Sequence, residues 1–170
     1  MDILVAYATA HGSTRSIAER MAAALRDEGF TAEARPFAEV EDVHAWQAFV
    51  LGSAVHSQRW LAPAEDFLSV HQELLATRPV WLYSVGMPAA LRGPWRRLAA
   101  KEEAVIERNL PPTLRYRGHR LFSGVIERSH LPRAGRLFFV LLGGRFGDFR
   151  DWAAVRGWTA GIAENLRRGG

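Results

Sequence analysis

The stretch that most constrains the fold is ILVAYATAHGSTRSIAERM, residues 3–21, in which a short apolar run leads through a polar cluster into a helical pattern. Residues 3–8 are almost all apolar, which is typical of a strand covered on both faces. Ile17, Met21 and Leu25 then recur at helical spacing, which predicts a helix that ends at the glycine that follows them. A buried strand that passes directly into a helix is the first half of a βαβ unit.

The rest of the chain continues this alternation. Further strands are predicted at residues 31–36, 48–52, 80–85 and 119–126. Between the third and fourth strands lies APAEDFLSVHQELL, in which Phe67, Val70 and Leu74 form an apolar helical face, and a closing helix is predicted after Asp151, a good N-cap residue. Strands separated by helix-length connections predict an α/β fold, a three-layer α/β/α sandwich around a mostly parallel sheet.

Length and composition narrow the class of protein. The 170 residues provide for one sizeable core, so a single domain over residues 1–170 is expected. No apolar run reaches the roughly 18 residues of a membrane span and no signal peptide pattern is present, so we expect a cytoplasmic protein. Because the chain has no cysteine, redox chemistry has to come from a bound cofactor. The histidine spacing predicts no zinc site, and the lack of a G-x-S-x-G motif disfavours a serine hydrolase.

Basic charge is concentrated in the second half of the chain. Residues 1–85 carry a net charge of −5 and residues 86–170 a net charge of +9. The densest basic segment, residues 108–136, holds seven arginines and one acidic residue, Glu127. Such a surface attracts an acidic substrate or anionic lipid, or is simply a solvated basic face. Because no nucleic-acid motif with interleaved aromatic residues accompanies it, nucleic acid is not expected as a partner.

The polar cluster TAHGST, residues 9–14, is placed between the first strand and the first helix. A helix N-terminus offers free backbone N–H groups and a partial positive charge, which favour a phosphate. Gly12 lets the backbone approach closely, and the hydroxyls of Thr9, Ser13 and Thr14 can donate hydrogen bonds to the same oxygens. The cluster has neither the G-K-[ST] of a P-loop nor a G-x-G-x-x-G fingerprint. It therefore predicts a passively held monophosphate rather than transfer of a nucleotide's terminal phosphoryl group.

Thr9, Gly12 and Thr14 form the pattern T-x-x-G-x-T after a first hydrophobic strand, which resembles the FMN-phosphate loop of flavodoxins. The order of elements is similar to the flavodoxin order, and this resemblance covers nearly the whole chain. It implies a flavodoxin-like, five-stranded parallel sheet in the order 2-1-3-4-5, with FMN bound by three loops. The cofactor-binding residues implied in this way are Thr9, Ala10, His11, Gly12, Ser13, Thr14, Ser53, Ala54, Val55, His56, Ser57, Trp60, Ser84, Val85, Gly86 and Met87.

Two kinds of residue in these loops have alternative interpretations. Trp60, and Trp95 on the opposite side, are candidates for stacking on the flavin, but each can also be a tryptophan that packs under a neighbouring helix. His11 and His56 can form a proton relay beside the flavin or be solvated loop histidines. No catalytic residue is assigned.

A basic, aromatic-rich segment, RSHLPRAGRLFFVLLGGRFGDFRDW, precedes the closing helix at residues 128–152. It resembles quinone-dependent protoporphyrinogen oxidases of the flavodoxin type. This second resemblance implies oxidation of a porphyrinogen substrate with transfer of electrons to a quinone. The arginines proposed to hold the substrate's carboxylates are Arg117, Arg120, Arg133 and Arg136. RLFFVLL is interpreted either as a peripheral membrane contact at the inner membrane face or as a buried helix turn or strand extension.

The sequence is also compatible with other functions. A flavodoxin-type electron carrier needs only a redox partner and no substrate of its own, although the basic second half is unlike the acidic docking surface that the flavodoxin resemblance implies. An NAD(P)H:quinone reductase and a flavin-free binding module are further alternatives.

Overall fold

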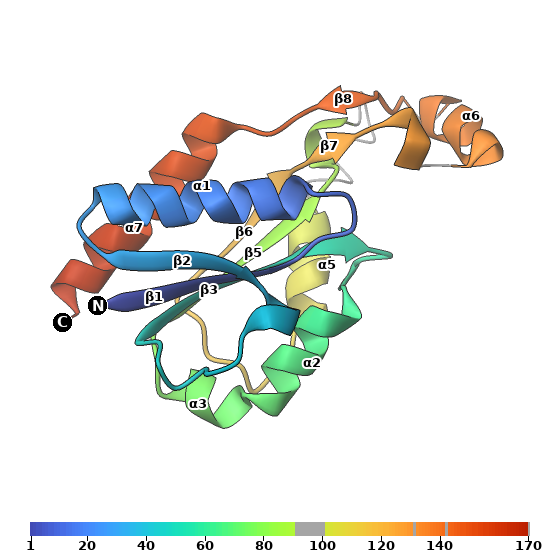
Figure 1. The fold of residues 1–170 in the computed structure, drawn as a ribbon. Helices are drawn as coiled ribbons and strands as arrows, with labels where there is room; N and C mark the ends of the chain where they lie inside the picture. Colours follow the sequence, from blue (N-terminus) through green and yellow to red (C-terminus); the bar gives the residue numbers. More distant parts are fainter. Residues whose placement is uncertain (91–100, 131, 142, 170) are drawn as a thin grey trace.

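The computed structural model describes residues 1–90, 101–130, 132–141 and 143–169. Five parallel strands form its central sheet in the order β2-β1-β3-β5-β6 (Figure 1). These are β1 (Asp2–Ala8), β2 (Thr31–Pro36), β3 (Ala48–His56), β5 (Val80–Gly86) and β6 (His119–Ser123). The short strand β4 (Arg59–Trp60) forms an antiparallel hairpin with β3. Counted along the parallel strands, this confirms the predicted order 2-1-3-4-5.

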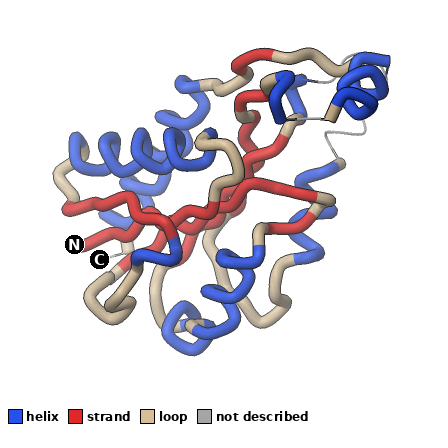
Figure 2. The backbone as a smooth tube through the Cα atoms, turned by 45° about the vertical axis from the view of Figure 1, so that its right-hand side comes forward, coloured by secondary structure: helices blue, strands red, loops and turns tan. Residues whose placement is uncertain are grey.

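Helices cover both faces of the sheet (Figure 2). One face carries α1 (Ser13–Asp27) and α7 (Trp152–Arg168), and the other carries α2 (Ala62–Val70), α3 (Gln72–Ala76) and α5 (Glu102–Asn109). The predicted α/β/α sandwich is therefore confirmed. The remaining elements are the 3-10 turns η1 (Phe37–Glu39), η2 (Pro88–Ala90) and η3 (Arg128–His130), the strands β7 (Val125–Ile126) and β8 (Gly147–Asp148), and α6 (Arg133–Leu141). Among the described residues, no helix combines the length and the apolar composition needed to cross a bilayer.

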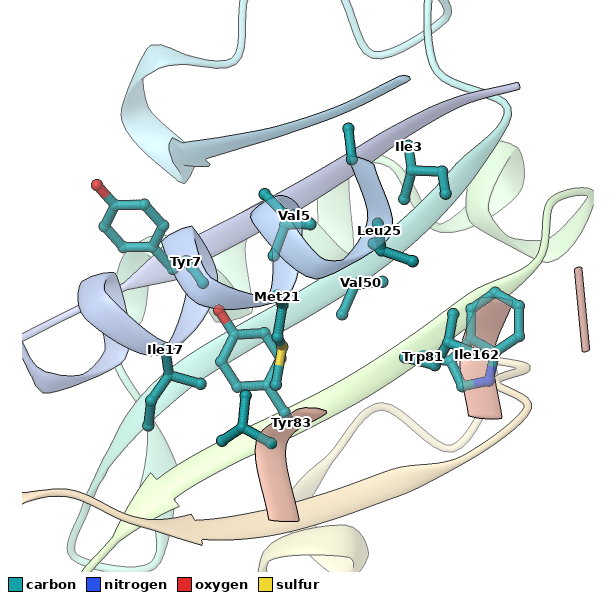
Figure 3. Packing of buried hydrophobic residues seen from close by; sticks show 14 of the residues in the cluster. Ile3, Val5, Tyr7, Ile17, Met21, Leu25, Val50, Trp81, Tyr83 and Ile162 are labelled. Carbon is teal, nitrogen blue, oxygen red and sulfur yellow. The ribbon is translucent and has the colours of Figure 1, made fainter. Parts of the chain in front are cut away.

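The core between α1 and the sheet follows the predicted helical spacing. Ile17, Met21 and Leu25 are each fully buried against the strands (Figure 3). On the same face Tyr83 lies across its cross-strand partner Gly52, where an added Cβ would be 2.0 Å from the tyrosine ring. A glycine at this position therefore makes room for the largest fully buried side chain of the described residues.

The helix predicted over residues 62–75 is divided, which corrects one part of its apolar face. It breaks at His71 into α2 and α3. Phe67 is buried as predicted, but Val70 is 75% exposed, and Leu75 enters the core in the following short helix. The break changes the rotation of the chain about the helix axis, so a single helical period does not hold across it.

The strand predicted over residues 119–126 is also interrupted. Between β6 and β7 stands Gly124, where an added Cβ would lie 3.0 Å from Val85 and 3.1 Å from Ser13. After this close passage over the start of α1, β7 leaves the central sheet and pairs with β8. The closing helix begins as predicted, with the Asp151 carboxylate accepting a hydrogen bond from the backbone of Ala154 at 2.9 Å.

Candidate functional site

A cavity of about 250 Å³ lies at the carboxyl ends of β1, β3 and β5. Its walls come from the three loops expected from the sequence and from the chain that follows β6. The lining residues are Thr9, Ala10, His11, Ser13, Thr14, Ala54, Val55, His56, Leu61, Val85, Gly86, Met87, Gly124, Val125, Ile126 and His130. The carboxyl ends of parallel strands share one edge of a sheet, which is why segments far apart in sequence meet here.

The side chain of Thr14 is evidence that this cavity binds a ligand. Thr14 is fully buried, and its Oγ1 has no hydrogen-bond partner among the described residues. A buried hydroxyl without a partner costs roughly 1–3 kcal/mol, so an oxygen of a bound group would stabilise it. Thr14 is the second residue of α1, and the first backbone N–H groups of a helix also lack partners within the helix. This donor set fits a phosphate.

The neighbouring residues shape the loop. Gly12 has a φ of 88°, a conformation that favours glycine, and an added Cβ would meet nothing within 4 Å. Its backbone N–H donates to Thr9 Oγ1 at 2.9 Å. Ser13 Oγ accepts from the backbone N–H of Val125 at 3.0 Å. Each of these two hydroxyls thus accepts an internal hydrogen bond while its own hydrogen can be donated to a ligand.

The segment after β6 braces the start of α1. Arg150, which follows β8, donates from Nη1 to Ser16 Oγ at 2.8 Å, and its guanidinium is paired with the carboxylate of Asp148. The Arg150 guanidinium holds the pKa of Asp148 below its usual value, chiefly through the side-chain hydrogen bond. The imidazole of His130 stacks on that of His11. A part of the chain more than a hundred residues away therefore contacts both the phosphate-loop candidate and the first turn of α1.

A larger and more open hollow of about 740 Å³ adjoins the cavity. The two share His11, Ser13 and His130 among their lining residues, and Gly12 lines the hollow. Arg128 and Arg150 reach the wall of the hollow, but so do the carboxylates of Glu127 and Asp148. Its lining therefore carries both signs of charge.

Trp60 lies in the core of the second sheet face and is absent from the cavity lining, which agrees with the interpretation of a packed tryptophan and not with stacking on the flavin. It is 5% exposed, and its Nε1 donates to Ser84 Oγ at 2.8 Å. Its neighbour Leu61 lines the cavity in its place. Ser53 is also fully buried: its Oγ donates to the carbonyl of Ala54 at 2.8 Å and accepts from the backbone N–H of Leu61 at 3.0 Å. The loops that line the cavity are thus supported from the core by the side chains of Ser53, Trp60 and Ser84.

Ser84 belongs to a polar network in which the side chains of Ser84 and His119 are buried and that of Glu107 is partly exposed. Its Oγ lies 2.8 Å from Nε2 of His119, and His119 Nδ1 lies 3.3 Å from Oε1 of Glu107. Burial lowers the pKa of His119, and the charges of Glu103 and Glu107 partly offset this effect. The order serine, histidine, glutamate has the form of a hydrolytic triad, but Ser84 is fully buried and no substrate can reach it. The network ties β5 and β6 to α5.

The remaining residues predicted to bind the cofactor lie at different distances from the cavity. Ser57 lies in the exposed turn of the β3–β4 hairpin at a φ of 50°, away from the cavity lining. His56 lines the cavity from the same hairpin, and Met87, 42% exposed, lies at its rim. Trp95 lies outside the described residues. His130 also lines the cavity but is not predicted from the sequence. Its sequence signal is weak, because a histidine in a basic segment is common on protein surfaces.

Two of the four arginines proposed as carboxylate partners, Arg117 and Arg120, lie away from the cavity. Arg117 lies at the opposite edge of the sheet, where it donates to Asn165 Oδ1 at 2.7 Å and covers the ring of Trp81. Arg120 is exposed on β6 and is absent from the cavity lining. Arg133 and Arg136 belong to α6. Among the described residues, no group of three or more histidine, aspartate or glutamate side chains is placed to bind a metal ion.

A parallel sheet of this order, with a candidate phosphate loop after its first strand, is the flavodoxin-like fold. A family model described as flavodoxin domain matches residues 4–140, and the chain belongs to that family. A search of curated protein sequences finds no match.

Solved structures agree on the fold. A flavodoxin from the domain Archaea is 16% identical and matches with a TM-score of 0.56 over 98% of this chain and 99% of its own. Oxidised flavodoxin 1 from Bacillus cereus is 12% identical, with a TM-score of 0.58 over 96% of this chain and 98% of its own. The flavodiiron core of Flv1 from Synechocystis sp. PCC6803 is 11% identical, with a TM-score of 0.59 over all of this chain and 37% of its own. At these identities the likeness shows the fold alone.

Proposed function

We propose that this chain, as one domain over residues 1–170, binds FMN in the cavity and exchanges electrons with a redox partner. The observation that carries the proposal is the buried hydroxyl of Thr14 at the N-terminus of α1, which has no hydrogen-bond partner within the described residues. Membership of the flavodoxin domain family supports the same cofactor. The volume at the strand ends is bounded by apolar groups such as Val55, Leu61 and Val85, which suit an aromatic ring.

The residues of the chain have separate tasks in this proposal. FMN, when bound, supplies the electron-transfer chemistry. Thr14 and the free N–H groups of α1 hold the phosphate, which requires no cationic side chain. Residues of the loops after β3 and β5 line the volume available to the ring, and Met87 leaves part of the rim apolar and exposed. That rim is where a redox partner can approach.

Titration of the purified chain with FMN tests this proposal. We expect saturable quenching of the flavin fluorescence at one FMN per chain, followed by reversible reduction and reoxidation of the bound flavin. Absence of saturable binding would contradict the proposal and would favour the flavin-free module.

A more specific proposal, from the basic C-terminal half, is oxidation of protoporphyrinogen with a quinone as acceptor at the inner membrane face. The position of Arg117 at the far edge of the sheet speaks against a complete ring of carboxylate partners, so the electron carrier is the better supported function. Anaerobic incubation of the FMN-loaded chain with protoporphyrinogen and a quinone distinguishes the oxidase from the electron carrier. Porphyrin formation above the non-enzymatic rate would support the oxidase. Bleaching of the flavin by NAD(P)H would instead favour the quinone reductase.

A further inference from the structure

Exposed apolar side chains are concentrated on α6. Of the six large apolar side chains that are exposed among the described residues, three belong to this helix: Leu137 at 66%, Val140 at 53% and Leu141 at 74%. Their spacing of three and four residues places them on one side of the helix. Exposed apolar residues scattered singly need no explanation, but a cluster on one helix side is typical of an interaction surface.

The orientation of α6 is fixed from its inner side. Phe139 is 8% exposed and packs in a small cluster with Ala90 and Ile126, and its ring contacts that of Phe146 with 5.2 Å between centroids. The backbone N–H of Gly144 donates to the carbonyl of Phe139 just after the helix. Leu137, Val140 and Leu141 are therefore held outward by a packed base. Figures 1 and 2 show α6 standing beyond β7 and β8, apart from the helices that cover the sheet.

The chain segments on either side of α6 in the sequence are rich in positive charge. Residues 127–150 contain five arginines and two acidic residues, a net charge of +3. Arg128 is exposed and lies over the ring of Phe146, and Arg145 is exposed and lies over the ring of Phe149. Both guanidinium groups are thus held at the base of the apolar projection. This pairing of aliphatic side chains with a basic surround is complementary to an anionic lipid surface.

We propose that α6 lies in an anionic lipid surface, with Leu137, Val140 and Leu141 inserted among the acyl chains and the nearby arginines at the headgroups. A protein partner fits less well, because a stable interface buries about 800 Å² on each partner, more than three side chains on a nine-residue convex helix supply. A second copy of the chain would bring two basic surfaces together. A lipid surface needs neither a large area nor a matching shape, only a helix that lies at the interface.

Attachment of α6 to lipid also has a consequence for the proposed redox function, and this consequence rests on FMN binding in the cavity. Ile126 both lines the cavity and belongs to the cluster that anchors α6. A lipid-bound α6 would therefore hold the cavity beside the membrane, where a lipid-soluble redox partner is concentrated. The test below uses vesicle binding as its readout, so it is independent of whether FMN binds.

Co-sedimentation of the full chain with vesicles tests the proposal. One set of vesicles is phosphatidylcholine alone and the other contains phosphatidylglycerol. The variant carries Leu137→Ser, Val140→Ser and Leu141→Ser, and the control carries Val70→Ser, since Val70 is 75% exposed on α2. We expect binding to the phosphatidylglycerol vesicles only, weakened about ten-fold or more in the α6 variant and unchanged in the control.

Circular dichroism and urea unfolding show whether the α6 variant is folded, and an α6 variant carrying only Leu141→Ser, at the most exposed of the three positions, serves if it is not. Wild-type binding by a folded α6 variant would overturn the proposal. Equal loss in the Val70→Ser control would reveal non-specific adsorption and would also overturn it. A dimer in light scattering that the α6 substitutions dissociate would assign the surface to a second copy instead.

Discussion

The imidazole rings of His11 and His130 are stacked, with 3.9 Å between their centroids and 8° between their planes. His11 belongs to the phosphate-loop candidate and His130 ends the 3-10 turn before α6. The backbone N–H of Glu127 donates to Nδ1 of His130 at 3.2 Å, which fixes the direction of that ring. The contact joins the phosphate-loop candidate to the segment between β7 and α6.

Replacement of His130 by alanine is expected to weaken FMN binding about three- to ten-fold, because the loop loses a stacking contact worth roughly 0.5–1.5 kcal/mol. Fluorescence titration with FMN measures the change. His44→Ala is the matched control, since His44 is exposed and outside the cavity lining. Equal affinities of the two variants would show that the stacked pair does not order the loop.

Gly12 and Gly29 provide a matched pair at the two ends of α1. Both have a φ of 88°, and an added Cβ would meet nothing within 4 Å at either position. Gly12→Val and Gly29→Val should therefore lower the free energy of unfolding by similar amounts, at least about 1 kcal/mol, because both force a β-branched residue into the left-handed region. FMN binding should be lost only in Gly12→Val, where the side chain blocks the approach of the phosphate. Retained FMN in that variant would argue against the loop as the phosphate site.

The buried His119 predicts a pH dependence of stability. Burial lowers its pKa in the folded state, so the unfolded chain binds the proton more readily. The stabilisation is complete above the unfolded pKa of about 6.5 and is lost progressively as the pH falls below it. Urea unfolding of the wild type and of His119→Gln between about pH 5 and about pH 8 measures this. The variant should show a smaller decrease on the acid side, and an unchanged slope would mean that His119 does not carry the effect.

Much of the fold could be predicted because its signals are local. Residues 3–8 and 80–85 are apolar runs typical of covered strands, and the phosphate-loop candidate lies within six consecutive residues. The sheet order then follows from the resemblance to flavodoxins and is confirmed.

The positions of Trp60, Val70 and His130 depend on tertiary contacts that the spacing of residues in the sequence does not reveal. The position of Trp60 is set by its register opposite Val55 in the β3–β4 hairpin, which turns its ring into the core toward Ser84. Val70 is exposed because α2 stops at His71. His130 reaches the cavity because Gly124 lets the chain cross the start of α1. Each of these three positions is set by a single residue or turn. Such local features do not change the pattern of apolar residues from which the fold is predicted.

The most direct measurement compares FMN with riboflavin, which lacks the phosphate, in binding to the wild type and to Thr14→Val. Valine keeps the shape of threonine and removes the unpartnered hydroxyl, so the flavin-free variant should be as stable as the wild type or slightly more so. We expect FMN affinity to fall about ten- to a hundred-fold, because a hydrogen bond to a charged group is lost, and riboflavin affinity to stay unchanged. Equal FMN affinity in the two proteins, or an equal loss for both ligands, would contradict the assignment of Thr14 and the N-terminus of α1 to the phosphate.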